Sequence, residues 1–192
     1  MGKVVVLDRD GVININNNFE GYQDNKDFYY ILKWKNFVFA PGAKEAISRL
    51  AHRGHCIVLI TIQKCISKGL ITLEEVEAIH TKMRASIREY DAKQFRLIQV
   101  NDSVYIYRTF IIPATDDKVQ SKYNAMCSFR RKWSIRDIGI GDSADDIVSY
   151  KKAGIYSVHI KLPHGDQEAP GADMVSDSLA NAVDTLIEKG LL

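Results

Sequence analysis

The sequence predicts an α/β fold, in which helices cover both faces of a parallel sheet and form three layers with it. Short aliphatic runs without polar alternation occur at residues 4–7, 56–60 and 138–140. Such runs are typical of strands that are buried on both faces. A helical pattern follows each run, and repeated strand–helix units form parallel sheets with right-handed crossovers.

The remaining elements follow from local signals along the chain. Pro41-Gly42 introduces a helix that ends near Gly54, and a capping box at Thr72 and Glu75 begins a long helix that should run to about Tyr90. The pattern further predicts strands at 95–100, 104–112 and 155–160, helices at 119–133 and 143–153, and a last helix capped by Asp177.

The chain of 192 residues is predicted to form one domain over residues 1–192. An aromatic-rich stretch at about 14–40 does not fit the strand–helix repeat. It is either a lid or hairpin that faces a substrate, or an elaboration whose rings pack on the domain body. Residues 163–173 read as a surface loop rich in glycine, proline and acids.

Composition agrees with a compact globular domain. The chain is 46% hydrophobic and has a net charge of +2, which provides no general attraction to nucleic acid or membranes. We find no apolar stretch of the ~18 residues that a membrane helix needs, and no signal-peptide pattern. The three cysteines are widely spaced, as expected for reduced thiols in the cytoplasm.

Chemistry-bearing side chains cluster at the predicted strand ends. Asp8 and Asp10 follow the first strand, Thr61 and Gln63 follow the second, and Asp142 follows a later one. Ligands of parallel α/β sheets bind beyond the carboxyl ends of the strands, so these groups should meet at one edge. The alternative for Asp8-Arg9-Asp10-Gly11 alone is a strand followed by a polar turn.

Four ordered motifs carry a family resemblance. These are Asp8-x-Asp10-Gly11, Thr61, Lys118, and Gly141-Asp142-x-x-x-Asp146. They resemble the haloacid dehalogenase (HAD) superfamily, and finer features resemble its histidinol-phosphate and D-glycero-D-manno-heptose-1,7-bisphosphate phosphatase branch. The resemblance covers nearly the whole chain and implies a Rossmann-like HAD fold with a minimal cap or none.

The resemblance implies roles for the acidic residues. Asp8 is the expected nucleophile, which forms an aspartyl-phosphate, and Asp10 the expected general acid and base. Asp8, the backbone carbonyl of Asp10, and Asp142 are the expected Mg²⁺ ligands. Asp146 should support the lysine or a metal-bound water, with Asp145 as the alternative.

Thr61, Gln63 and Lys118 are the expected phosphate- and substrate-binding residues. Lys122 competes with Lys118, but Lys118 matches the family spacing to Asp142 better. His80 lies beside the apolar stripe of the long helix and is interpreted as a packed or solvent-edge histidine.

The resulting prediction is a Mg²⁺-dependent phosphomonoester hydrolase that acts on a small phosphorylated metabolite, in particular a heptose-like sugar phosphate. The alternatives are a polynucleotide 3′-phosphatase-like enzyme and a catalytically silent HAD-fold binding protein. We expect a monomer or weak dimer without nucleic-acid or membrane partners.

Two departures from the branch refine this prediction. The branch carries a zinc loop of cysteines and a histidine, whereas residues 99–117 contain neither type, so no zinc is expected. The branch also has an asparagine and an arginine where this chain has Ile62 and Asp117. An aliphatic group and a reversed charge there should disfavour a second phosphate.

Overall fold

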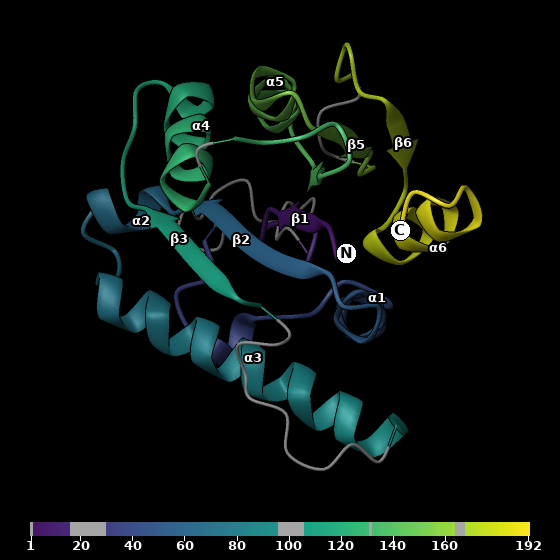
Figure 1. The fold of residues 1–192 in the computed structure, drawn as a ribbon. Helices are drawn as coiled ribbons and strands as arrows, with labels where there is room; N and C mark the ends of the chain where they lie inside the picture. The colour runs from purple at the N-terminus through teal and green to yellow at the C-terminus, as the bar shows by residue number, and fades with distance from the viewer. Residues whose placement is uncertain (1, 16–29, 96–105, 131, 164–167) are drawn as a thin grey trace.

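The computed structural model describes residues 2–15, 30–95, 106–130, 132–163 and 168–192. Its centre is a parallel sheet with the strand order β3-β2-β1-β4-β5-β6 (Figure 1). The strands are β1 (Val4–Leu7), β2 (Cys56–Ile62), β3 (Arg108–Ile112), β4 (Ile138–Gly141), β5 (Tyr156–Ile160) and β6 (Met174–Ser176). This arrangement confirms the predicted fold class.

Helices form a layer on each face of the sheet. The helices are α1 (Ala43–His52), α2 (Lys64–Ser67), α3 (Leu73–Phe95), α4 (Lys118–Phe129), α5 (Ala144–Ala153) and α6 (Leu179–Glu188). Helix α1 packs against α3 and α6 on one face, and α4 packs against α5 on the other (Figure 1). No helix in the described ranges is both long and apolar enough to cross a bilayer.

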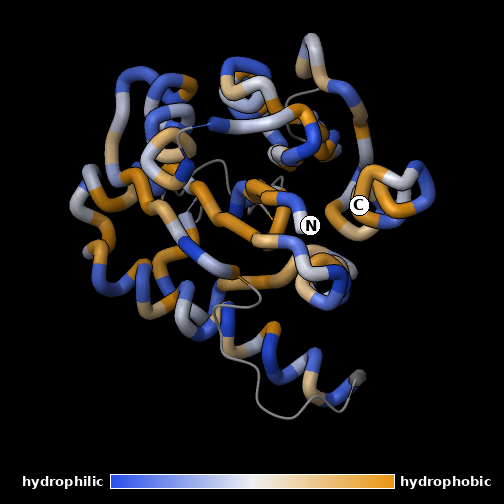
Figure 2. The backbone as a smooth tube through the Cα atoms, viewed as in Figure 1, coloured by the Kyte–Doolittle hydropathy of each residue, from blue (hydrophilic) through white to orange (hydrophobic). Residues whose placement is uncertain are grey.

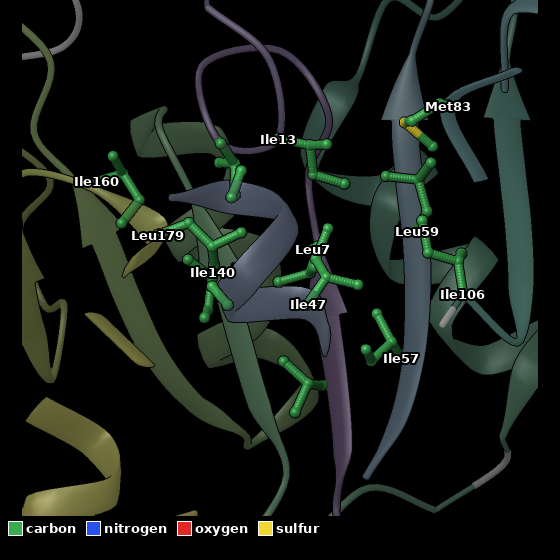
Figure 3. Packing of buried hydrophobic residues seen from close by; sticks show 14 of the residues in the cluster. Leu7, Ile13, Ile47, Ile57, Leu59, Met83, Ile106, Ile140, Ile160 and Leu179 are labelled. Atoms are coloured by element: carbon green, nitrogen blue, oxygen red, sulfur yellow. The ribbon is translucent and has the colours of Figure 1, made fainter. Parts of the chain in front are cut away.

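The alternation of side chains along the strands divides the core in two. Leu7 of β1 packs with residues of α1, α3 and α6, whereas Val6 packs with Met126 of α4 and Ile147 of α5. Figure 3 shows Leu7 beside Ile47 of α1 in the first of these clusters. The central strands β1 and β2 are hydrophobic along most of their length, as Figure 2 shows, because both of their faces are covered.

Several boundaries differ from the sequence prediction. Helix α3 continues to Phe95, so the strand expected from residue 95 does not begin there, and 96–105 lie outside the described residues. Helix α4 ends at Phe129 because Arg130 has an extended backbone. Strand β6 was not predicted. The cap of α6 is Ser178, not Asp177: its hydroxyl accepts from the backbone N–H of Asn181 at 3.2 Å.

The aromatic-rich stretch at 14–40 is described only at its ends, since 16–29 lie outside the described residues. The backbone N–H of Ile15 donates to Val38 at 2.9 Å, which brings the two ends together. Phe37 is buried in the core and stacks on Trp34 with 5.2 Å between ring centroids. The described part of this stretch therefore packs its rings on the domain body; whether the rest forms a lid stays a prediction.

The strand order reverses at β1, which lies between β2 and β4. From β1 the chain first adds β2 and β3 on one side and then crosses to add β4, β5 and β6 on the other. Ligands of open α/β sheets bind at such a switch point, beyond the carboxyl ends of the strands. The topology therefore directs attention to the ends of β1 and β4.

Candidate active site

The loop after β1 places two carboxylates beside the end of β4. Asp8 directly follows β1, and its backbone N–H donates to the carbonyl of Ile140 at 3.0 Å. Gly11 has a φ of +78°, and a Cβ there would lie 2.2 Å from Oδ2 of Asp142. Only glycine combines this backbone conformation with so close an approach, so Gly11 allows the two strand ends to share one site.

A pocket of about 300 Å³ lies at these strand ends. It is lined by residues of β2 and α4 and of the segments that follow β1, β2 and β4. It brings together six of the predicted site residues, namely Asp8, Asp10, Thr61, Gln63, Lys118 and Asp142. Tyr30, Ile62 and Lys64 also line it. A concave site with converging polar groups is typical of a small-molecule site.

The lysine in contact with Asp8 is Lys122, the alternative to Lys118, and both lysines line the pocket. Nζ of Lys122 lies 3.2 Å from Oδ1 of Asp8 and also contacts Oδ1 of Asp146. Both partners enclose it, and its side chain is 5% exposed. Lys118 lines the pocket but pairs with Asp145 at 3.1 Å, and its side chain is 44% exposed.

Asp146 supports this lysine through the start of α5. Oδ2 of Asp146 accepts from the hydroxyl of Ser143 at 2.7 Å, while Oδ1 receives Lys122. The two residues form a capping box, which locks the carboxylate to the first turn of the helix. Asp146 thus contacts Lys122, whereas Asp145 pairs with Lys118, and the supporting role of Asp146 stays a prediction.

Three carboxylates gather beneath the pocket. Asp8, Asp142 and Asp146 each offer an oxygen, and these oxygens lie within 4.8 Å of one another. Burial raises the pKa of Asp8 to about 7, since Lys122 offsets only part of the effect of burial and of the neighbouring acids. Burial, followed by the charges of Asp8 and Asp146, raises the pKa of Asp142 to about 9. The cluster thus has an excess of negative charge that a divalent cation would relieve.

Asp10 has a different environment, and its carboxylate is not part of this cluster. Although burial opposes ionisation, the guanidinium of Arg9 and hydrogen bonds from Gln63 and Asn14 hold the pKa of Asp10 below its usual value. Nε2 of Gln63 donates to Oδ2 of Asp10 at 2.9 Å, and Nδ2 of Asn14 donates to Oδ1 at 3.0 Å. The two motif-one acids therefore differ in protonation tendency although they stand two residues apart.

Thr61 and Gln63 are linked to each other at the end of β2. Nε2 of Gln63 donates to Oγ1 of Thr61 at 2.8 Å, in addition to its bond to Asp10. Both side chains are buried, and both line the pocket. Gln63 thus connects the threonine predicted to bind phosphate with the acid predicted to transfer protons.

Sequence reasoning missed Arg9 and His80 as site residues. Arg9 contacts Asp10 and Gln63, and Nη1 of Arg9 lies 3.2 Å from Nε2 of His80 on α3. His80 is buried, which agrees with its interpretation as a packed histidine and excludes the solvent-edge alternative. The available signal was its position on the apolar stripe with Val76 and Met83, where a polar side chain needs a buried partner.

Asp117 does not lie in the pocket, where a residue that repels a second phosphate would have to be. It is the N-cap of α4, and its Oδ1 accepts from the backbone N–H of Gln120 at 2.8 Å. It is exposed and is not among the residues that line the pocket. Its position therefore gives no support to the inference that it repels a second phosphate, whereas Ile62 does line the pocket.

Curated proteins are similar to this chain in sequence. A D-glycero-beta-D-manno-heptose-1,7-bisphosphate 7-phosphatase of Rhodopseudomonas palustris is 28% identical over 78% of each chain. A protein of the same name from Haemophilus ducreyi is 25% identical over 94% of this chain and 96% of its own. No family profile matches the sequence.

Solved structures show the same fold. The D,D-heptose 1,7-bisphosphate phosphatase of B. bronchiseptica, solved with magnesium and phosphate, superposes with a TM-score of 0.76 at 21% identity. It covers 97% of this chain and 99% of its own. The comparisons agree with the predicted resemblance: the chain is similar in sequence to heptose-bisphosphate phosphatases and shares their fold.

Proposed function

We propose that this chain is a Mg²⁺-dependent phosphatase that hydrolyses a small phosphorylated sugar through an aspartyl-phosphate on Asp8. The observation that carries the proposal is the buried contact of Asp8 with Lys122, beside the carboxylate of Asp142 in the same pocket. A carboxylate nucleophile and a phosphate repel each other, so positive charge must be placed beside both. Lys122 is placed to supply part of that charge.

The acidic cluster suits a hard divalent cation. Mg²⁺ prefers carboxylate and carbonyl oxygens, and Asp8 and Asp142 would hold it together with the backbone carbonyl of Asp10. Asp146 already binds Lys122 and Ser143, which favours a supporting function. When bound, Mg²⁺ neutralises charge on the phosphoryl group.

Asp8 and Asp10 would divide the chemistry. An oxygen of Asp8 attacks phosphorus, the bond from phosphorus to the ester oxygen breaks, and that oxygen leaves with its electron pair and a proton from Asp10. Asp10 must take up this proton before the step, because its ionised form is favoured in the free protein. Asp10 then removes a proton from a water molecule, which attacks phosphorus and restores the Asp8 carboxylate. Thr61 and Lys122 line the pocket where phosphoryl oxygens would lie, with Lys118 at its exposed side.

The names of the curated relatives support a sugar phosphate as substrate, and the pocket of about 300 Å³ suits a substrate of this kind. Ile62 in the pocket removes a hydrogen-bonding side chain that the branch has, so we retain a monophosphorylated sugar as the preferred substrate. We further propose that the chain acts as a single domain in the cytoplasm and needs no zinc.

The test is phosphate release from a panel, with and without Mg²⁺. It contains p-nitrophenyl phosphate, acetyl phosphate, several sugar mono- and bisphosphates, histidinol phosphate and a 3′-phosphorylated oligonucleotide. We expect Mg²⁺-dependent turnover with the highest kcat/KM on a sugar monophosphate. Preference for the oligonucleotide would favour the nucleic-acid alternative, and no release from any substrate would favour a silent binding protein.

A second measurement addresses the metal. Mg²⁺ at 100 times its Kd should raise the free energy of unfolding by ~2.7 kcal/mol, because it binds the folded state alone. Asp142→Asn should remove this stabilisation. Stoichiometric zinc in the purified protein, lost together with the fold on chelation, would contradict the proposal of Mg²⁺ alone.

A further inference from the structure

Arg9 is a buried cation to which the chemistry above gives no function. It stands between the two motif-one aspartates and is 1% exposed. Its Nη2 lies 2.9 Å from Oδ1 and 3.0 Å from Oδ2 of Asp10, and its Nε lies 3.2 Å from Oδ1. Burying a charged side chain costs stability that an apolar side chain would not, so a buried arginine at a strand end calls for an explanation.

The rest of the guanidinium is also held. Nη2 donates to Oε1 of Gln63 at 3.0 Å, and Nη1 lies 3.2 Å from Nε2 of His80. A guanidinium has donors and no acceptor, so Nε2 of His80 accepts and the ring is neutral with its proton on Nδ1. Arg9 is thus fixed from Gln63 on one side and His80 on the other.

His80 makes this contact at a cost of its own. It is 1% exposed, and its Nδ1 has no hydrogen-bond partner among the residues that the structure describes. It lies on the face of α3 that buries Val76 and Met83 in the core. The contact therefore joins the loop after β1 to a helix distant in the sequence. A histidine occupies this core position of α3 although an apolar residue would pack there at lower cost.

We infer that Arg9, held in place by the neutral ring of His80, is a positioning residue that keeps the Asp10 carboxylate in one orientation at the pocket. This inference rests on the proposed function, in which Asp10 exchanges protons with the leaving group and with water. Proton transfer requires a well-ordered donor, and a bidentate guanidinium orders a carboxylate more than a single hydrogen bond does. Gln63 completes the arrangement, since it bonds both Arg9 and Asp10.

The test compares kcat/KM for two substrates that need Asp10 to different degrees. Acetyl phosphate expels a weakly basic acetate and requires little protonation, whereas a sugar monophosphate from the panel expels an alkoxide and requires a proton. Arg9→Met should lower kcat/KM on the sugar phosphate by ~100-fold or more and on acetyl phosphate by less than ~10-fold, as expected for lost general-acid catalysis. Asp10→Asn should show the same selectivity.

Two further comparisons separate positioning from folding. The double variant Arg9→Met/Asp10→Asn should be no slower on the sugar phosphate than Asp10→Asn alone, because Arg9 acts through Asp10. His80→Gln keeps a hydrogen-bond acceptor for Arg9 and should retain most of the wild-type kcat/KM on the sugar phosphate. His80→Leu removes the acceptor and should show the selective loss on this substrate. If Arg9→Met fails to fold, Arg9→Lys keeps the charge without the fork and should show the selective loss.

The possible outcomes are distinct. Equal losses on both substrates, or additive losses in the double variant, with an active wild-type enzyme, would overturn this inference and leave the proposed function standing. A wild-type protein that releases phosphate from neither substrate would overturn the proposed function itself. Selective and non-additive losses would support both.

Discussion

Nζ of Lys122 lies 3.2 Å from Oδ1 of Asp8, which joins the fourth helix to the end of the first strand. The pair is buried, and Asp146 is the second partner of the lysine. The negative charges of Asp8 and Asp146, against the opposing effect of burial, hold the pKa of Lys122 above its usual value. A permanent positive charge therefore stands beside the proposed nucleophile.

The first prediction concerns the two lysines. Lys122→Met should lower kcat by ~100-fold or more, because a preorganised charge beside the reacting group is lost. It should also lower the free energy of unfolding by ~3–5 kcal/mol, since Asp146 would remain buried without its cation. Steady-state kinetics and chemical denaturation measure the two effects.

Lys118→Met is the matched control. Its pair with Asp145 is exposed, and exposed pairs contribute ~0–1 kcal/mol, so stability should hardly change. A larger loss of kcat in Lys118→Met than in Lys122→Met would show that the spacing argument for Lys118 was right after all.

The second prediction separates activity from stability at Asp8. Asp8→Asn should abolish turnover, because an amide does not attack phosphorus. The melting temperature without metal should stay the same or rise. Burial raises the pKa of Asp8 to about 7, so its ionised form is disfavoured in the folded protein. Asp146→Asn should instead lower the melting temperature, because it removes the partner of Lys122. A melting temperature that falls equally in both variants would contradict this distinction.

The third prediction concerns acid stability at His80. Burial, with a contribution from Arg9, lowers the pKa of His80 from 6.5 to about 3 in the folded protein. Between these values the unfolded chain binds a proton that the folded protein does not. His80 therefore contributes stability that is present above pH 6.5 and is lost as the pH falls toward 3, at about 1.4 kcal/mol per pH unit.

His80→Gln should flatten this part of the stability profile. Urea denaturation at pH 7 and at pH 4.5 measures the difference for wild type and variant, and the carboxylates contribute alike to both. An equal loss of stability in the two proteins over this range would show that His80 is already protonated in the folded state.

The fourth prediction concerns Asp117. Because it caps α4, Asp117→Ala should lower the free energy of unfolding by ~0.5–2 kcal/mol. The ratio of kcat/KM for sugar bisphosphates to that for monophosphates should not change, because Asp117 does not line the pocket. A shift of this ratio toward the bisphosphate would restore the interpretation of Asp117 as a residue that repels a second phosphate.

The strands that could be predicted are those buried on both faces. Residues 4–7 and 138–140 read as strands because helices cover both sides, so that every position favours an apolar side chain. Strand β6 escaped prediction because it has three residues and its central Val175 is 58% exposed, which leaves no apolar run.

The acids of the candidate site could be predicted because they directly follow predicted strands, whose carboxyl ends must meet at one edge of a parallel sheet. The lysine that contacts Asp8 could not be predicted in this way. Lys118 and Lys122 stand one helical turn apart, so both occupy the same face of α4 and helical periodicity does not distinguish them. The family spacing to Asp142 favoured Lys118, but spacing along the chain does not determine which lysine reaches Asp8. The packing of α4 on the sheet determines which of the two lysines lies beside Asp8 at the end of β1.

By itself, then, the sequence determined the fold class, the order of the strand–helix units and the set of acids at the sheet edge, because these depend on local periodicity and on the geometry of parallel strands. Only the tertiary structure decided that Lys122 contacts Asp8, that Asp117 caps a helix outside the pocket, and that His80 reaches Arg9. These contacts join elements far apart in the chain, and they depend on how helices pack on the sheet, which no local pattern records.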